Sequence, residues 1–242
     1  MILQVEGLTK SFGGVMAVRD LSFEVFAGER LGIIGPNGAG KTTTFNMISG
    51  EYRPTSGVIR LEGVRIDGLR PHEINRRGVA RTFQIVRVFG SLTVREHILT
   101  GVLSRYPGLR IGIRQEEEVE ELIQLTGLDR FRSTWAGNLT TPYKKRLELA
   151  TALATRPKLL LLDELMAGLN PVEVEESMHL LRRINEELGI TLVVVEHVMK
   201  AIMGLCQRII VLHHGEKIAE GTPQEVASNH RVIEAYLGEE YA

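Results

Sequence analysis

The nine residues that decide the fold of this chain read Gly35-Pro36-Asn37-Gly38-Ala39-Gly40-Lys41-Thr42-Thr43. They fit the pattern G-x-x-x-x-G-K-[ST], which is typical of a phosphate-binding loop. Residues 30–34 are mostly apolar and predict a short buried strand, while residues 41–49 predict a helix that ends at Gly50. A strand, a glycine-rich turn and a helix together place consecutive backbone N–H groups around an anion, at the positive end of the helix dipole.

Single side chains of this loop have predicted roles. Gly38 and Gly40 let the backbone approach a phosphate closely because neither residue carries a Cβ atom. Lys41 is expected to reach the β- and γ-phosphates of a nucleotide, and the Thr42 hydroxyl is expected to face Mg²⁺. A chance glycine-rich loop is the alternative, and the flanking strand and helix argue against it. We therefore expect all of residues 35–43 to take part in nucleotide binding.

Length and composition narrow the class of protein. A chain of 242 residues suits one large domain or a domain with an insertion, and an apolar fraction of 43% is that of an ordinary globular protein. A net charge of −1 offers no general attraction for nucleic acid, so no nucleic-acid partner is expected. No apolar run is long enough to span a bilayer, the start does not resemble a signal peptide, and the single cysteine, Cys206, cannot form an internal disulfide. These features predict a soluble cytosolic protein.

The second strong signal is the run Lys158-Leu159-Leu160-Leu161-Leu162-Asp163-Glu164. A continuous apolar run suits the central strand of a parallel sheet, covered on both faces. Its two acids then stand at the carboxyl end of the strand, where α/β sheets bind ligands. Asp163 can hold Mg²⁺ through water, and Glu164 can orient or deprotonate a water. The alternative is that both acids are simply solvated at the end of a strand. The presence of a phosphate-binding loop in the same chain argues against this alternative.

Two other predicted strands end in candidate polar residues. Gln84 follows the predicted strand at 79–83 and is either a solvated residue or one that reaches Mg²⁺ and the attacking water. His197 follows the strand at 190–195, on the edge of the sheet where it can touch the γ-phosphate, and is the only one of the seven histidines so placed. No cluster of cysteines or carboxylates indicates a zinc site.

The rest of the chain divides into β-rich and helical parts. Residues 1–34 and 58–66 predict strands, and Phe12, in a glycine-containing loop, can stack on a base, although such a residue is more often part of the core. Residues 88–152 predict a helical insertion, with helices that start at Thr93 and at 140–141 and an amphipathic helix at 115–126. Residues 105–114 predict a loop, and the acids at 116–121 are expected to face solvent. Lys144-Lys145-Arg146 is expected to be surface charge. Residues 171–188 predict a helix that Asn170 caps.

The order of these features resembles, throughout the chain, the ATP-binding subunit of ABC transporters. The resemblance implies an α/β fold with a P-loop NTPase (RecA-like) core and a mainly parallel sheet, an N-terminal antiparallel β subdomain and an inserted α-helical subdomain. It implies one ABC ATPase domain in total, with the core at 1–87 and 153–242 and the helical signature subdomain at 88–152.

The resemblance also implies that two subunits sandwich two ATP molecules with Mg²⁺. Each ATP then lies between the phosphate loop of one subunit and the signature helix of the other. The family pattern implies catalytic roles for Glu164, His197 and Gln84, metal contacts from Thr42, Gln84 and Asp163, and nucleotide contacts from Phe12 and Val18. The signature residues, which would contact the ATP of the second subunit, are Leu139, Thr140, Thr141, Pro142 and Tyr143.

Within the family, the chain looks most like an ATPase of branched-chain amino acid importers. The stretches at 80–84, 166–171, 195–199 and 235–239 carry this closer likeness. It implies as partners a second ABC ATPase subunit, identical or different, membrane-spanning permease subunits and, indirectly, a substrate-binding protein, and it places the chain on the inner face of the cell membrane. Related subunits serve urea and lipopolysaccharide transporters. Other readings are a soluble ABC ATPase that acts on DNA, ribosomes or cluster assembly, and a regulator that senses nucleotide.

The signature departs from the usual Leu-Ser-Gly-Gly-Gln. Here residues 139–143 read Leu-Thr-Thr-Pro-Tyr, so Thr140 preserves a hydroxyl but Pro142 has no N–H to donate to a phosphate. We therefore expect slow hydrolysis where this signature serves the site. A second departure is Leu165, where a proline usually follows the glutamate. Residues 84–96, with the apolar Phe89, are expected to form a groove for a helix of the permease, or else to pack the helical insertion.

Overall fold

The computed structural model describes residues 1–106 and 112–240, and residues 107–111 of the predicted loop lie outside this part. Two sheets organise the chain. The first has four antiparallel strands in the order β2-β1-β4-β5. Its strands are β1 (Leu3–Phe12), β2 (Val15–Val25), β4 (Ser56–Leu61) and β5 (Val64–Arg65). The predicted N-terminal antiparallel part is therefore confirmed.

The second sheet has six strands in the order β10-β9-β3-β8-β7-β6, and its strands are parallel except at the β9–β10 edge. Its strands are β3 (Arg30–Ile34), β6 (Val79–Arg81), β7 (Leu159–Asp163), β8 (Thr191–Val195), β9 (Arg208–His213) and β10 (Glu216–Gly221). Along β7, Leu160 and Leu162 pack on one face, while Leu159 and Leu161 pack on the other. The run of leucines is thus a strand buried on both sides, as predicted.

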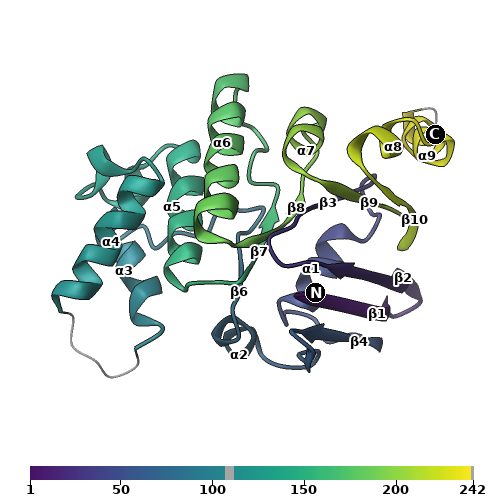
Figure 1. Cartoon of the computed structure of the whole chain (residues 1–242), viewed down its shortest axis with the longest axis horizontal. Coiled ribbons are helices and arrows are strands. Elements are labelled where there is room, and N and C mark those ends of the chain that lie inside the picture. The colour runs from purple at the N-terminus through teal and green to yellow at the C-terminus, as the bar shows by residue number, and fades with distance from the viewer. Residues whose placement is uncertain (107–111, 241–242) are drawn as a thin grey trace.

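Helices cover both faces of this sheet (Figure 1). The α1 helix packs with the antiparallel sheet on one face, and α5, α6 and α7 pack on the other. In Figure 1, α3, α4 and α5 form a group on the left. The helices are α1 (Lys41–Ile48), α2 (Pro71–Arg76), α3 (Val94–Leu103), α4 (Ile113–Leu125), α5 (Thr141–Ala154), α6 (Pro171–Leu188), α7 (Met199–Leu205), α8 (Pro223–Ala227) and α9 (His230–Glu240), with 3₁₀ turns at Asp129–Phe131 and Ala136–Asn138.

Two helix starts follow from local sequence. Thr93 caps α3, because its side chain accepts from the Glu96 N–H at 3.3 Å while the Glu96 carboxylate accepts from the Thr93 N–H at 2.8 Å. Asn170 caps α6 in the same way with Glu173. Each pair satisfies N–H groups that the first turn of a helix leaves without partners. Both predicted starts are confirmed.

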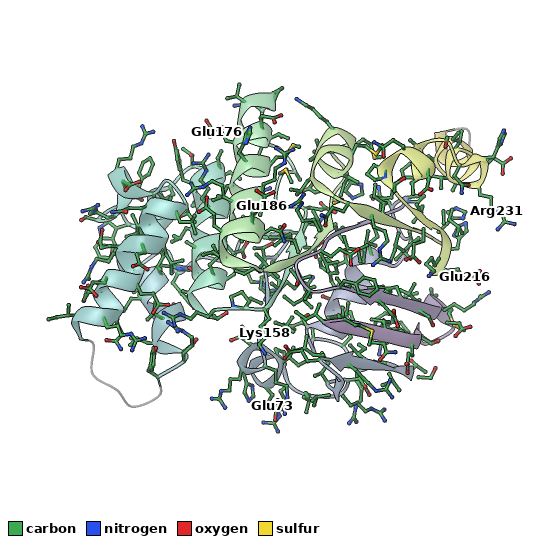
Figure 2. All side chains as sticks on the ribbon, viewed as in Figure 1. Glu73, Lys158, Glu176, Glu186, Glu216 and Arg231 are labelled. Atoms are coloured by element: carbon green, nitrogen blue, oxygen red, sulfur yellow. The ribbon has the colours of Figure 1, made fainter. Side chains whose placement is uncertain are left out.

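The acidic face of α4 differs from the prediction. Glu118 is only 9% exposed, and its Oε1 pairs with Arg105 and, at 3.0 Å, with Arg156. The prediction that all the acids of this helix face solvent is wrong for Glu118, because the chain brings two arginines from other segments over that position. Other charged side chains, such as Glu73 on α2 and Arg231 on α9, lie on the outside of the molecule (Figure 2).

The division into a core and a helical insertion stays a prediction. The predicted boundary between residues 152 and 153 falls inside α5, which continues to Ala154. Within residues 1–106 and 112–240, no helix is long and apolar enough to cross a membrane.

Candidate active site

The loop after β3 depends on its glycines. At Gly35, with φ of +150°, a Cβ atom would lie 2.1 Å from the backbone oxygen of Leu212. At Gly40, with φ of +98°, a Cβ atom would lie 2.5 Å from the backbone oxygen of Ala17. Gly38 also has a positive φ, of +77°, but nothing lies within 4 Å of its Cβ position. Close backbone packing therefore requires glycine at the base of the loop, while the tip faces open space that a ligand can fill.

Lys41 opens α1 and points back into the loop. Its side chain is buried, and Nζ donates to the backbone oxygens of Gly35 at 2.6 Å and Pro36 at 2.9 Å. Its positive charge is therefore held inside the curve of the loop, where a bound phosphate would meet it. The other loop residues divide by exposure into Asn37 and Gly38 at the surface, Gly40, Thr42 and Thr43 at intermediate depth, and Gly35, Pro36 and Ala39 beneath them.

Phe12 and Val18, the two predicted contacts outside the loop, differ in exposure. Phe12 is exposed at the end of β1, with its ring 5.3 Å from that of Tyr52 and 4.9 Å from the Lys10 Nζ. Its ring is therefore available for stacking. Val18 is fully buried beneath the loop, where its Cγ2 would lie 3.2 Å from a Cβ atom at Gly40. Other atoms cover the Val18 side chain, so its position suits packing beneath the loop.

Two residues that follow parallel strands, Gln84 and His197, converge on the carboxylate of a third, Glu164. Gln84 Nε2 donates to Glu164 Oε2 at 2.9 Å, and His197 Nε2 lies 2.9 Å from Glu164 Oε1. Glu164 has a φ of +52°, which is uncommon outside glycine, and its N–H donates to the backbone oxygen of Val195 at 2.8 Å. Such backbone conformations cost free energy and concentrate at functional sites. The predicted grouping of Gln84, Glu164 and His197 at one sheet edge is therefore what the strands produce.

Asp163, at the end of β7, fits a magnesium ligand. It is 1% exposed, and its Oδ2 accepts from Arg81 Nη2 at 2.7 Å. Its Oδ1 is buried and has no hydrogen-bond partner in the part of the chain that the structure describes. Burial raises the pKa of Asp163, and the Arg81 guanidinium opposes that rise. A buried carboxylate oxygen without a donor suits a hard cation, and Mg²⁺ commonly uses one or two carboxylates together with phosphate oxygens and waters.

Arg81 is a site residue for which the sequence predicted no role. Its guanidinium also donates to Asn46 Oδ1 of α1 at 2.6 Å and to Oγ of Ser49, the residue that caps the end of α1, at 3.1 Å. It lies over the rings of Phe45 and Phe83, at 5.7 and 5.1 Å. Arg81 thus joins the end of β7 to the helix that follows the phosphate loop. The signal in the sequence was a charged residue inside an otherwise apolar strand.

With this geometry established, comparison with known proteins is informative. A family model described as "ABC transporter" matches residues 18–167, and a second, described as "Branched-chain amino acid ATP-binding cassette transporter", matches residues 216–242. The chain belongs to the ABC transporter family. Membership implies a cassette that binds and hydrolyses ATP. The predicted family and the predicted P-loop fold are therefore confirmed.

Relatives match the cassette over nearly its whole length. The high-affinity branched-chain amino acid transport ATP-binding proteins BraF of Pseudomonas aeruginosa and LivG of Escherichia coli strain K12 are 41% and 40% identical to it, over 98% of both chains in each case. A solved nucleotide-free ATP-binding cassette from an ABC transporter superposes with a TM-score of 0.88 at 28% identity, covering 97% of this chain and 98% of the other. A dimeric cassette bound to ADP and Pi superposes with a TM-score of 0.83 at 27% identity, covering 92% and 99%.

The predicted signature, residues 139–143, lies at the start of α5. Leu139 is buried, Thr140 and Thr141 are exposed, and Pro142 is the second residue of the helix. The ring of Tyr143 packs 4.3 Å from that of Phe131 and is half-buried. In Figure 1, α5 and α1 lie on opposite sides of β6 and β7, so the helix that starts in the predicted signature is separated from the helix that follows the phosphate loop.

Two buried charges on α5 were also missed. Lys145 and Glu148 are each 6% exposed, so the prediction of surface charge at 144–146 is wrong for Lys145. Lys145 Nζ donates to the backbone oxygens of Glu164 at 3.1 Å and Ala167 at 2.7 Å. Burial raises the pKa of Glu148 to about 7. The signal available in the sequence was a pair of opposite charges three residues apart on the predicted helix.

Proposed function

We propose that this chain is the ATP-hydrolysing subunit that powers an ABC importer of branched-chain amino acids. The observation that carries the enzymatic part is the convergence of Gln84 and His197 on Glu164, beside the buried Asp163 and at the same sheet edge as the phosphate loop. The solute rests on the names of BraF and LivG and on the match of residues 216–242 to a branched-chain amino acid cassette model.

In this proposal the loop at 35–43 holds the phosphates of ATP. Backbone N–H groups contact them, and the Lys41 ammonium turns from its present carbonyl partners to the β- and γ-phosphates. Phe12 stacks on the adenine. Thr42, Gln84 and Asp163 would hold Mg²⁺, which when bound would neutralise the charge that develops on the phosphate oxygens.

Glu164 is the residue that acts on water. Its two oxygens are held by Gln84 and His197, which orients the carboxylate toward the sheet edge. From there it orients the attacking water and accepts its proton. In this proposal His197 and Gln84 would also contact the γ-phosphate and its metal, so the same two residues would link the nucleotide to the base.

The partners follow from two surfaces. The signature at 139–143 faces a second cassette, identical or different, whose ATP it contacts. Ile85 and Phe89, 82% and 63% exposed on the loop after Gln84, offer an apolar contact for permease subunits, which hold the chain at the inner face of the membrane. Val88 from the same loop packs into the core, so only part of this stretch is free to dock. A substrate-binding protein then acts through the permease.

Two measurements test the proposal. Glu164→Gln should retain ATP binding, stop phosphate release and accumulate a dimer with trapped ATP, whereas wild-type turnover would show that another group positions the water. Vesicles that contain the chain with its permease subunits, supplied outside with the substrate-binding protein, should take up labelled leucine when ATP and the cassette are both inside. ATP hydrolysis without leucine uptake would reject the solute, and co-sedimentation with ribosomes or DNA in place of membranes would reject transport.

A further inference from the structure

The α5 helix carries two buried opposite charges close to its signature end, and each touches a different catalytic loop. We propose that Lys145 and Glu148 form a brace that holds Glu164 and Gln84 against one another and ties both to the signature. The two are positioning residues, since they act through Glu164 and Gln84. The inference rests on the proposed ATPase function and adds to it a mechanical link within the chain.

Lys145 holds the segment that contains Glu164. Its Nζ donates to the backbone oxygen of Glu164 at 3.1 Å and to that of Ala167, three residues later, at 2.7 Å. The Glu164 backbone is in an unfavourable conformation, with φ of +52°, so an external contact helps to keep it there. A buried ammonium needs compensation to be tolerated, and Lys145 receives it from these carbonyls and from the nearby Glu148, Glu164 and Glu196.

Glu148 holds the segment that contains Gln84. Its Oε1 accepts from the Arg87 N–H at 3.1 Å, and its Oε2 accepts from the Phe83 N–H at 3.4 Å. Residues 82–89 have no helix or strand, so their N–H groups depend on such side-chain partners. The two bonds lie on either side of Gln84. Glu148 therefore fixes the loop from which Gln84 reaches Glu164.

The positions of Lys145 and Glu148 on α5 link the brace to the signature end of the helix. The helix begins at Thr141 within the signature, and Lys145 is four residues later, or about 6 Å along the axis. A shift of the signature end, as a second subunit with ATP docks on it, is therefore felt one turn away at the Glu164 backbone and two turns away at the Gln84 loop. The brace thus couples the ATP held by the second subunit to the catalytic carboxylate of this one.

The test compares Lys145→Met with Lys144→Met. Lys144 is the adjacent residue of the same helix, and its side chain has no partner within the described residues, so it is a matched control. In the assembled complex, Lys145→Met should lower kcat by about 10- to 100-fold, because small displacements of catalytic groups have effects of this size. The Kd for ATP should stay within about twofold, since Lys145 does not face the phosphate loop. Lys145→Arg, which keeps the charge and the donors, should recover part of the rate, and Lys144→Met should keep all of it.

A second readout does not depend on turnover. Trp135 is the only tryptophan of the chain, is 52% exposed, and lies five residues before Thr140 on the segment that leads into α5. A non-hydrolysable ATP analogue should shift the Trp135 emission in the wild type and in Lys144→Met, and the shift should be lost in Lys145→Met. Loss of the shift while analogue binding persists supports the brace.

Several results would overturn the brace. One is a Lys145→Met variant with wild-type kcat or with the full emission shift, and another is a wild type without any shift. A different outcome is that Lys145→Met loses kcat only because it folds less well. Such a variant would have a lower urea midpoint and weaker ATP binding, and Lys145→Arg would not restore the rate. This result would show that Lys145 has a purely structural role. Absence of ATPase activity in the wild type would instead reject the proposed function, while the emission data would still decide the brace.

Discussion

Glu196 is predicted to make the folded state less stable as pH rises toward 7. The residue follows β8, and its Oε1 accepts from the Met166 N–H at 2.5 Å, while its Oε2 is buried without a partner in the described part of the chain. Burial raises the pKa of Glu196 from 4.5 to about 7, against the opposing effects of Met166 and of the Lys145 charge. Replacing it by glutamine keeps the acceptor for Met166 and removes the titration.

The sign and size follow from proton binding. In the unfolded chain this carboxyl loses its proton near pH 4.5, whereas in the folded chain it keeps the proton until about pH 7. Between these values the folded state binds more protons, so the free energy of unfolding falls as pH rises and levels off above pH 7. The separation of about 2.5 pH units, at about 1.4 kcal/mol each, corresponds to about 3.5 kcal/mol. The charge on Lys145 is shared with neighbouring carboxylates, so about 1–3 kcal/mol is expected in the variant.

Urea unfolding at pH 5, 6, 7 and 8 measures this directly. The free energy of unfolding of Glu196→Gln minus that of the wild type should increase by about 1–3 kcal/mol from pH 5 to pH 8, because the difference cancels the titration of every group that is not coupled to Glu196. Glu117→Gln, on the exposed side of α4, is the control and should give a constant difference. A difference for Glu196→Gln that stays flat within about 0.5 kcal/mol would show that the folded protein does not hold this proton.

Three further predictions concern the nucleotide and the partners. Lys41→Ala should abolish tight ATP binding, because its Nζ is the charge held inside the loop, and unchanged affinity by calorimetry would contradict this. Phe89→Asp should uncouple hydrolysis from transport at an unchanged urea midpoint, and a full rate of uptake would place the permease contact elsewhere. Pro142→Gly should speed hydrolysis by a dimer of this chain roughly a hundredfold or more, since one preorganised donor is worth about 3–4 kcal/mol in another enzyme. If that variant folds, binds ATP and dimerises without a faster rate, the missing N–H is not limiting.

Short-range patterns in the sequence determined much of this protein. The loop at 35–43, the capped starts of α3 and α6 and the leucine run of β7 each depend on residues within a few positions of one another, so local spacing alone predicted them. The strand ends then predicted which polar residues share the sheet edge. Gln84 and Glu164 are 80 residues apart in the chain, yet they hydrogen-bond because β6 and β7 are parallel neighbours.

Only the tertiary structure decided which of the remaining charged side chains are buried and which groups they contact. Lys145 looked like part of a solvated basic cluster, and Glu118 like part of a solvated acidic face, but both are buried. Arg81 likewise acquired its role from contacts with α1 and β7. The residues adjacent in sequence do not indicate whether a charged side chain is buried. Its environment depends on which distant segment packs over it and whether that segment supplies a compensating charge or carbonyl.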